Sequence, residues 1–148
     1  MDESGFEHET LRPFGYAPIG EPCIDSYNWQ AKRRTNVIDA LYEKTLFALD
    51  YFDKHINGDI FYRWCKQTLI PSLKRQCVII MDNASFHKRA IKLFNRHGHR
   101  VLFLPPYSPD LNPIEKKWAY AKFLRQGWMV NDLPKLFYDM GCAPFILD

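Results

Sequence analysis

The sequence lacks the cysteine and histidine spacings that build metal-bound or disulfide-linked small domains. Its four cysteines, Cys23, Cys65, Cys77 and Cys142, lie far apart, with no CxxC pair and no cysteine and histidine run at zinc spacing. Neither a structural zinc site nor a disulfide framework is therefore indicated. We expect the protein to work in a reducing compartment.

Long hydrophobic runs are also missing. No apolar stretch approaches the roughly 20 residues that a membrane-spanning helix needs. The N-terminus has no charged start followed by an apolar secretory segment. The net charge of +3 permits a polyanionic partner but is too small to prove one. We expect a soluble, cytoplasmic protein with no membrane partner.

The chain has enough apolar side chains to bury a core. It has 148 residues, of which 47% are hydrophobic and 16% aromatic, and it contains no internal repeat or low-complexity segment. We therefore expect a folded rather than a disordered chain, and the length fits one domain spanning residues 1–148.

Turn residues and apolar periodicity divide the chain into strand and helix signals. Residues 35–42 and 45–52 are rich in β-branched and aromatic residues, and Glu43 and Lys44 between them predict a tight β-hairpin. Three prolines and two glycines in residues 11–22 predict a loop or hairpin connection. The other predicted elements are a helix capped by Asp59 and ending near 71–74, a buried strand at 77–81, a helix at 88–97 stopped by Gly98, a strand at 100–104, a helix starting at Asn112 and Pro113, and a helix at 132–140 closed by Gly141.

A strand-like segment is also needed before residue 11, which makes the fold class α/β, a mixed sheet covered by helices. Asp82 and Glu115 each follow a strand-like run, and functional groups converge at the carboxyl ends of strands in α/β domains. Both are therefore candidate metal ligands. Structural roles stay open: Asp82 as a turn or cap residue, Glu115 as the partner of Asn112 in a capping box, and Asp2 as a solvated, mobile chain end.

Two segments carry a specific resemblance. MDNASFH at 81–87 and LPPYSPDLNPIEKKW at 104–118, with 32 residues between Asp82 and Glu115, resemble the catalytic core of the IS630/Tc1/mariner superfamily of DDE transposases. DESGF at 2–6, followed by RPFGYAPIGEP at 12–22, resembles the first catalytic segment of that family. The resemblance extends from Asp2 to about Arg125. It implies a ribonuclease H-like fold whose first central strand is truncated, since Asp2 stands almost at the start of the chain.

The resemblance implies a metal-dependent DNA strand cleavage and strand transfer site. Its three metal-binding carboxylates fall on Asp2, Asp82 and Glu115, with two Mg²⁺ ions, for which Mn²⁺ substitutes. Mg²⁺ is a hard cation that takes oxygen ligands, and two ions about 4 Å apart activate the attacking oxygen and stabilise the leaving one. In such enzymes water attacks a DNA phosphodiester in line, and the freed 3′ hydroxyl then attacks target DNA.

Other residues of the same segments are candidates for supporting the site or for contacting DNA. Asn83, His87 and Asn112 are expected to support the carboxylates. The residues expected to contact DNA are Lys88, Arg89, Tyr107, Ser108, Lys116, Lys117 and Lys122, with Arg125 beside them. Structural readings stay open, with His87 as a local hydrogen-bonding residue, the lysines as a solvated face and the loop residues as purely structural. Trp118 is expected to form a core stripe with Ile114 and Ala121.

The N-terminal helix-turn-helix modules of complete transposases have no counterpart in the sequence. Two interpretations follow. The chain is either the downstream portion of a transposase, joined to an upstream portion or encoded separately, or a catalytically inactive remnant with at most weak, non-specific DNA binding. For the first we expect DNA at transposon ends and targets as the partner, a homo-oligomer when complete, and a prokaryotic host.

Overall fold

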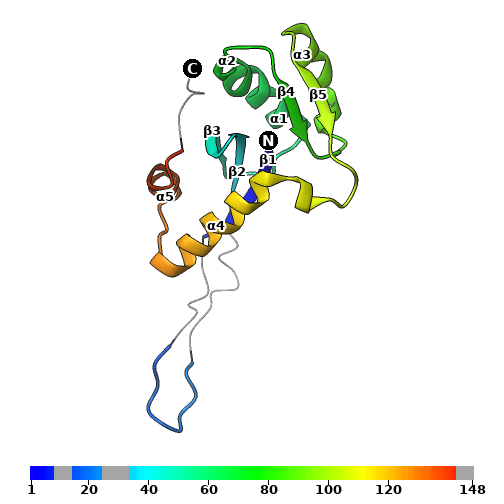
Figure 1. Ribbon diagram of the computed structural model, residues 1–148. Helices are drawn as coiled ribbons and strands as arrows, with labels where there is room; N and C mark the ends of the chain where they lie inside the picture. The colour runs from blue at the N-terminus through cyan, green and yellow to red at the C-terminus, as the bar shows by residue number, and fades with distance from the viewer. Residues whose placement is uncertain (9–14, 25–33, 143–148) are drawn as a thin grey trace.

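The computed structural model describes residues 1–8, 15–24 and 34–142. They form a mixed α/β structure, with helices packed around one antiparallel and one parallel sheet (Figure 1). The antiparallel sheet has the order β1-β2-β3, and β4 pairs with β5 in parallel. The strands are β1 Asp2–Glu7, β2 Arg34–Tyr42, β3 Thr45–Phe52, β4 Val78–Met81 and β5 Arg100–Phe103. The α/β prediction is confirmed in outline, with the strands divided between two sheets.

The predicted hairpin is confirmed by β2 and β3, which pair from Asn36 opposite Phe52 to Tyr42 opposite Thr45. Glu43 in the connecting turn has a positive φ of 53°, as tight hairpin turns require. The register shifts after Ile38, so that β2 is irregular at the next residue.

The predicted strand before residue 11 is confirmed by β1, which pairs with β2 along its whole length. Asp2 is the first residue of this strand. The reading of Asp2 as a solvated chain end is wrong, because Asp2 is 8% exposed. The ammonium group of Met1 donates a 2.9 Å hydrogen bond to the carbonyl oxygen of Ile80, so the start of β1 lies between β2 and β4.

One face of the antiparallel sheet is covered by a helical run made of α1 Gly58–Trp64, the π-helical η1 Cys65–Leu69 and α2 Ile70–Ser72. The helix is confirmed, but its predicted cap is wrong. The side chain of Asn57, and not that of Asp59, accepts hydrogen bonds from the first free N–H groups. Asn57 has the extended backbone that a capping residue adopts, whereas Asp59 already lies in the first turn. The apolar residues that this run buries are Phe61, Trp64, Cys65 and Leu69.

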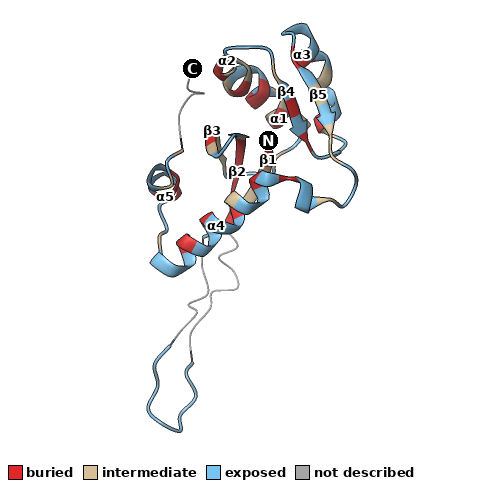
Figure 2. Ribbon diagram, in the orientation of Figure 1, coloured by how far each residue is buried: buried red, intermediate tan, exposed pale blue. Residues whose placement is uncertain are grey.

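The opposite face is covered by α4 Pro113–Trp128 and α5 Leu133–Asp139. Phe6 and Val37 of the sheet pack there, and the predicted stripe of Ile114, Trp118 and Ala121 is confirmed, with each residue at most 1% exposed. Figure 2 shows buried segments recurring along α4. The helix predicted at 132–140 is also confirmed, since Asp132 caps α5 and Gly141 follows with a φ of 76°.

The parallel pair is covered by η2 His87–Ala90, a 3₁₀ turn, and α3 Ile91–Arg96, which confirm the helix predicted at 88–97. The predicted strand at 100–104 is confirmed by β5. The strand predicted at 77–81 is confirmed as β4, but the prediction that it is buried is wrong. Val78 is 60% exposed and Ile80 43%, while Ile79 and Met81 are buried, because only one face of this pair is covered by described residues.

The loop predicted at 11–22 is confirmed for residues 15–22, which have a turn at 19–20 but no helix or strand. Residues 11–14 lie outside the described part of the chain. Among the described residues, no helix combines the length and apolar character that crossing a membrane requires.

Candidate active site

Three separate elements bring a carboxylate to the same cavity, which has a volume of about 470 Å³. Asp2 comes from the start of β1, Asp82 from the position after β4, and Glu115 from the first turn of α4. The loop 104–109, between β5 and α4, forms another wall. The three residues chosen from the sequence as metal ligands therefore share one cavity, although Asp82 and Glu115 lie 80 and 113 positions after Asp2 in the chain.

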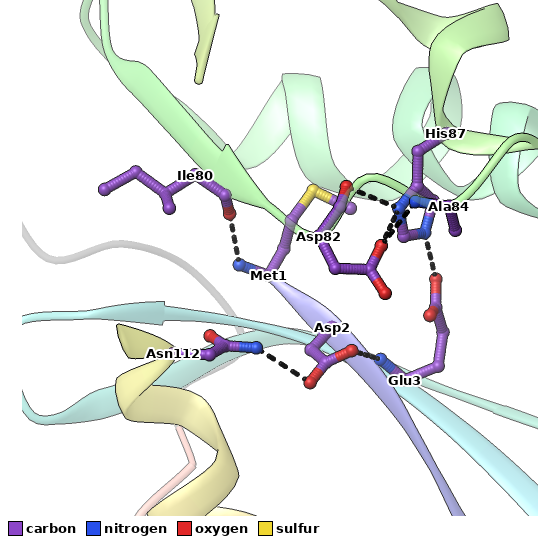
Figure 3. A network of polar contacts seen from close by, with 8 residues as sticks. All are labelled: Met1, Asp2, Glu3, Ile80, Asp82, Ala84, His87 and Asn112. Carbon is purple, nitrogen blue, oxygen red and sulfur yellow. Dashed lines mark hydrogen bonds and ion pairs between the residues drawn. The ribbon is translucent and has the colours of Figure 1, made fainter. Parts of the chain in front are cut away.

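Asp2 is held by hydrogen bonds on both carboxylate oxygens (Figure 3). Its Oδ1 accepts from the backbone N–H of Glu3 at 2.8 Å, and its Oδ2 accepts from Nδ2 of Asn112 at 3.0 Å. Burial raises the pKa of Asp2 to about 7, and the charges of Glu3 and Glu115 add to the rise. A carboxyl group in these surroundings favours its proton unless a cation is present to balance the charge.

Asn112 precedes α4, but its side chain does not act as the cap that the sequence predicts. The amide points to Asp2 instead, and only the backbone carbonyl of Asn112 accepts from the N–H of Glu115, at 3.1 Å. Pro113 has no N–H of its own, which leaves fewer free donors in the first turn for a cap to satisfy. The amide thereby joins the start of α4 to the start of β1.

Asp82 directly follows β4, and its side chain is half exposed. Its Oδ1 accepts from the N–H of Ala84 at 3.0 Å and lies 2.6 Å from Nδ1 of His87 (Figure 3). The bond from Ala84 confirms Asp82 as a residue that stabilises the local turn, and the same side chain also lines the cavity. Asn83 is exposed and lines the same cavity.

His87 is fully buried and lies against the rings of Phe61 and Phe86, at centroid distances of 4.3 and 4.4 Å. Burial opposes a charge on the imidazole, but the hydrogen bond to Glu3 and the charges of Glu3 and Asp82 outweigh it and raise the pKa of His87 above its ordinary value. A direct bond to one of the three candidate carboxylates makes His87 part of the site's framework.

Glu3 is the site residue that the sequence analysis missed. Its Oε1 lies 2.8 Å from Nε2 of His87. Strand alternation gave a signal for the direction of its side chain. Neighbouring strand residues point to opposite faces, so Glu3 must face away from Asp2. That face is the one that carries the buried helical run and η2. The identity of its partner, 84 residues away, has no local signal.

Glu115 is exposed on the first turn of α4. The capping-box reading fails for its partner, because the side chain of Asn112 makes no cap hydrogen bond. The charge of Glu115 instead contributes to the raised pKa of Asp2, which places the two carboxylates within electrostatic reach of each other.

The donor set suits a hard divalent cation in its chemistry, since carboxylate oxygens are the ligands that Mg²⁺ prefers. Within the described part of the chain, however, no three histidine, cysteine, aspartate or glutamate side chains come close enough together to hold one ion. The carboxylates share the cavity without the spacing of a formed metal centre, and binding would require their side chains to close together.

The candidate DNA-contacting residues divide into exposed and occupied groups. Lys88, Lys116 and Lys122 are exposed, and Lys117 is half-buried. Arg89 is exposed but pairs with Asp59. The lysines are therefore the cations best placed to meet a polyanion.

In the loop that walls the cavity, Tyr107 is fully exposed, with a φ of 56°, while Ser108 is half-buried and donates to the carbonyl oxygen of Pro106. Arg125 does not fit the expected phosphate contact. It is 5% exposed and donates to the carbonyl oxygens of Val130 and His8. Its position on the inner side of α4 assigns it to packing.

Comparison with known families agrees with this geometry. Residues 1–129 match the family described as DDE superfamily endonuclease. The chain belongs to the DDE superfamily of endonucleases. This DDE endonuclease domain is also 38% identical over 63 residues to "Uncharacterized protein y4pE/y4sA" of Sinorhizobium fredii (strain NBRC 101917 / NGR234). The match covers 43% of the chain and 44% of the relative, so the chain spans less than half the length of the relative it matches.

Proposed function

We propose that this DDE endonuclease domain is the catalytic domain of a transposase of the IS630/Tc1/mariner superfamily. It cuts and joins DNA strands with Asp2, Asp82 and Glu115. The observation that carries the proposal is the meeting of these three carboxylates, from β1, the end of β4 and α4, in one cavity. The segments around Asp82 and Glu115, which resemble that superfamily, support it, and so does the family match over residues 1–129.

Mg²⁺ is the proposed cofactor, as two ions with Mn²⁺ as a substitute, and it would be held by Asp2, Asp82 and Glu115. When bound, such ions activate an attacking oxygen and stabilise a leaving one during in-line displacement at phosphorus. Asp2 has a pKa of about 7 without a cation. A nearby divalent cation favours the ionised form, so binding releases the proton that burial and neighbouring charges retain.

The residues around the carboxylates fix their positions. Asn112 holds Oδ2 of Asp2, and Asn83 lies beside Asp82 at the cavity wall. The loop 104–109 contains three prolines, whose restricted backbone keeps the wall stiff between β5 and α4. These groups orient the site before DNA arrives, which reduces the reorganisation needed during the reaction.

DNA is the proposed substrate and partner, both as transposon ends and as target. Lys88, Arg89, Lys116, Lys117 and Lys122 contact phosphates in this proposal, because cationic side chains supply the sequence-independent part of DNA affinity. Tyr107 and Ser108 contact the strand at the cavity mouth. Residues 1–148 act as a single domain with a ribonuclease H-like fold. Assembly into a homo-oligomer with an upstream transposase portion is part of the same proposal.

A catalytically inactive remnant is the competing function, and one observation favours it. No three metal-ligating side chains among the described residues are close enough to share an ion. The two functions differ in whether the cavity can close around a cation and cut DNA.

Incubation of the full chain with supercoiled plasmid and Mn²⁺ separates them. We expect nicked circles with 3′ hydroxyl ends that a polymerase extends directly, and no nicking in the presence of a chelator. Intact plasmid at every Mn²⁺ concentration, with DNA retained in a binding assay, would favour the remnant.

A further inference from the structure

Glu3 lies on the opposite side of β1 from the cavity-facing Asp2. Its side chain is 17% exposed, and its Oε1 contacts Nε2 of His87 at 2.8 Å. Figure 3 shows the carboxylate directed at the ring and the ring directed at Asp82. A carboxylate so placed is outside the set of proposed metal ligands, yet it touches a side chain that contacts one of them.

His87 has an acidic partner on each ring nitrogen. Nε2 faces Glu3 at 2.8 Å, and Nδ1 faces Oδ1 of Asp82 at 2.6 Å. Nδ1 also lies 3.3 Å from the backbone carbonyl oxygen of Asp82, so each ring nitrogen faces oxygen atoms. The rings of Phe61 and Phe86 lie against the imidazole and restrict its rotation.

We propose that Glu3 is a positioning residue, which holds the carboxylate of Asp82 in one orientation through His87. This relay, Glu3 to His87 to Asp82, rests on the proposed function of Asp82 as a metal ligand. Both contacts of the Asp82 side chain in this network fall on Oδ1, which leaves Oδ2 to meet a cation. Partners in the layer behind metal ligands commonly fix ligand orientation in this way.

Through the relay, β1 positions two of the three carboxylates. Asp2 belongs to the strand directly, and Asp82 is tied to the next residue of the same strand through His87. Without Glu3, Asp82 keeps its bond to the N–H of Ala84, but His87 loses its hydrogen-bond partner at Nε2. The expected consequence is a weaker cation site in a chain that still folds.

Two substitutions with the same charge test the relay. Glu3→Gln keeps an oxygen that can accept from Nε2, whereas Glu3→Met has similar length but no such acceptor. Both remove one negative charge, so the difference between them reports the hydrogen bond and not the charge. Glu7→Gln, at the other end of β1, is the control for loss of charge from the strand.

Mn²⁺ affinity of the free protein, measured by calorimetry, is the first readout. We expect Glu3→Met to bind Mn²⁺ on the order of tenfold more weakly than wild type. Glu3→Gln should lie between the two, and Glu7→Gln should match wild type. Thermal melting checks that each variant folds. Equal affinities for Glu3→Gln and Glu3→Met would overturn the relay, as would wild-type affinity in both.

Nitrogen NMR of His87 is the second readout. We expect the Nε2 signal, assigned by its loss in His87→Gln, to shift more in Glu3→Met than in Glu3→Gln, because only Glu3→Met removes the hydrogen-bond partner of Nε2. Equal shifts in the two variants would overturn the relay. Absence of Mn²⁺ binding by wild type would overturn it too, whereas Mn²⁺ binding without nicking would overturn the proposed function alone.

Discussion

Asn112 donates a buried 3.0 Å hydrogen bond from Nδ2 to Oδ2 of Asp2, across 110 residues of sequence. The bond joins the residue before α4 to the first residue of β1. Because Glu115 stands three positions after Asn112, the same contact sets the first turn that carries Glu115 in relation to Asp2. The amide of Asn112 therefore contributes to the relative placement of the two candidate carboxylates, together with the packing of α4 on the sheet.

Asn112→Ala tests that dependence. We expect the free energy of unfolding to fall by about 1 to 2 kcal/mol, as for loss of a buried hydrogen bond to an acidic group. Plasmid nicking should fall on the order of tenfold, because Asp2 loses the donor that orients it. Urea denaturation and initial nicking rates measure the two effects. The matched control is Asn131→Ala, at an exposed position, and equal effects of the two substitutions would contradict the assignment.

The metal-free chain should lose stability as pH rises through the range in which Asp2 titrates. Burial raises the pKa of Asp2 from 3.8 to about 7, so the folded chain binds more protons than the unfolded chain between these values. Stability from this group therefore falls with rising pH in that window. Buried Asp39, raised to about 8 mainly by burial, acts in the same direction.

Urea denaturation at a series of pH values measures the slope of the unfolding free energy against pH. Asp2→Asn should flatten it, and Asp53→Asn, at an exposed position, should leave it unchanged. Mg²⁺ should stabilise the wild type most above the upper end of the window, where Asp2 is ionised. A wild-type slope retained in Asp2→Asn would show that Asp2 titrates normally.

Asn57 rather than Asp59 caps the first helix, so substitution of the two residues by alanine should destabilise the chain to different extents. Asn57→Ala should destabilise the chain by about 1 kcal/mol, because two N–H groups lose their acceptor. Asp59→Ala should cost less, since Asp59 loses only a surface pair with Arg89. Thermal melts of the two variants decide the order. A larger loss for Asp59→Ala would restore the cap predicted from the sequence.

Lys116 and Lys117 are expected to contact DNA phosphates. The double substitution Lys116→Ala with Lys117→Ala should weaken binding to any duplex and reduce the slope of log affinity against log salt by about 2. Fluorescence anisotropy over a salt series gives that slope. Lys66→Ala with Lys135→Ala removes the same charge from exposed positions on other helices. An identical change in the salt slope for both pairs would mean that Lys116 and Lys117 act only through net charge and not by contacting phosphates.

Local sequence patterns predicted the hairpin, the α4 core stripe and α5 because their signals lie within single elements. Residues 35–52 alternate and turn at Glu43, and Ile114, Trp118 and Ala121 follow helical spacing. The exposure of Val78 had no such signal, because a parallel strand is buried only if other segments cover both faces of its sheet. Burial there depends on neighbours that the strand itself does not encode.

Site residues that stand in a sequence motif were predicted. Site contacts that form only when distant segments fold together were missed. Asp82 and Glu115 stand in segments with recognisable residue order, whereas the partner of Glu3 is set by folding. Asn112 shows a related difficulty. Asparagine before proline at a helix start indicates a cap, but the same amide can bind any nearby acceptor, and Asp2 is the one that the fold supplies.

Metal-dependent nicking by four single variants tests the central claim most directly, namely that three carboxylates form one cutting site. Nicking of supercoiled plasmid is measured against Mn²⁺ concentration for wild type, Asp2→Asn, Asp82→Asn and Glu115→Gln. Asp139→Asn, an exposed carboxylate at the end of α5, is the control. We expect nicking by wild type and Asp139→Asn and none by the other three. Wild-type nicking by any of those three would remove that carboxylate from the site and contradict the account.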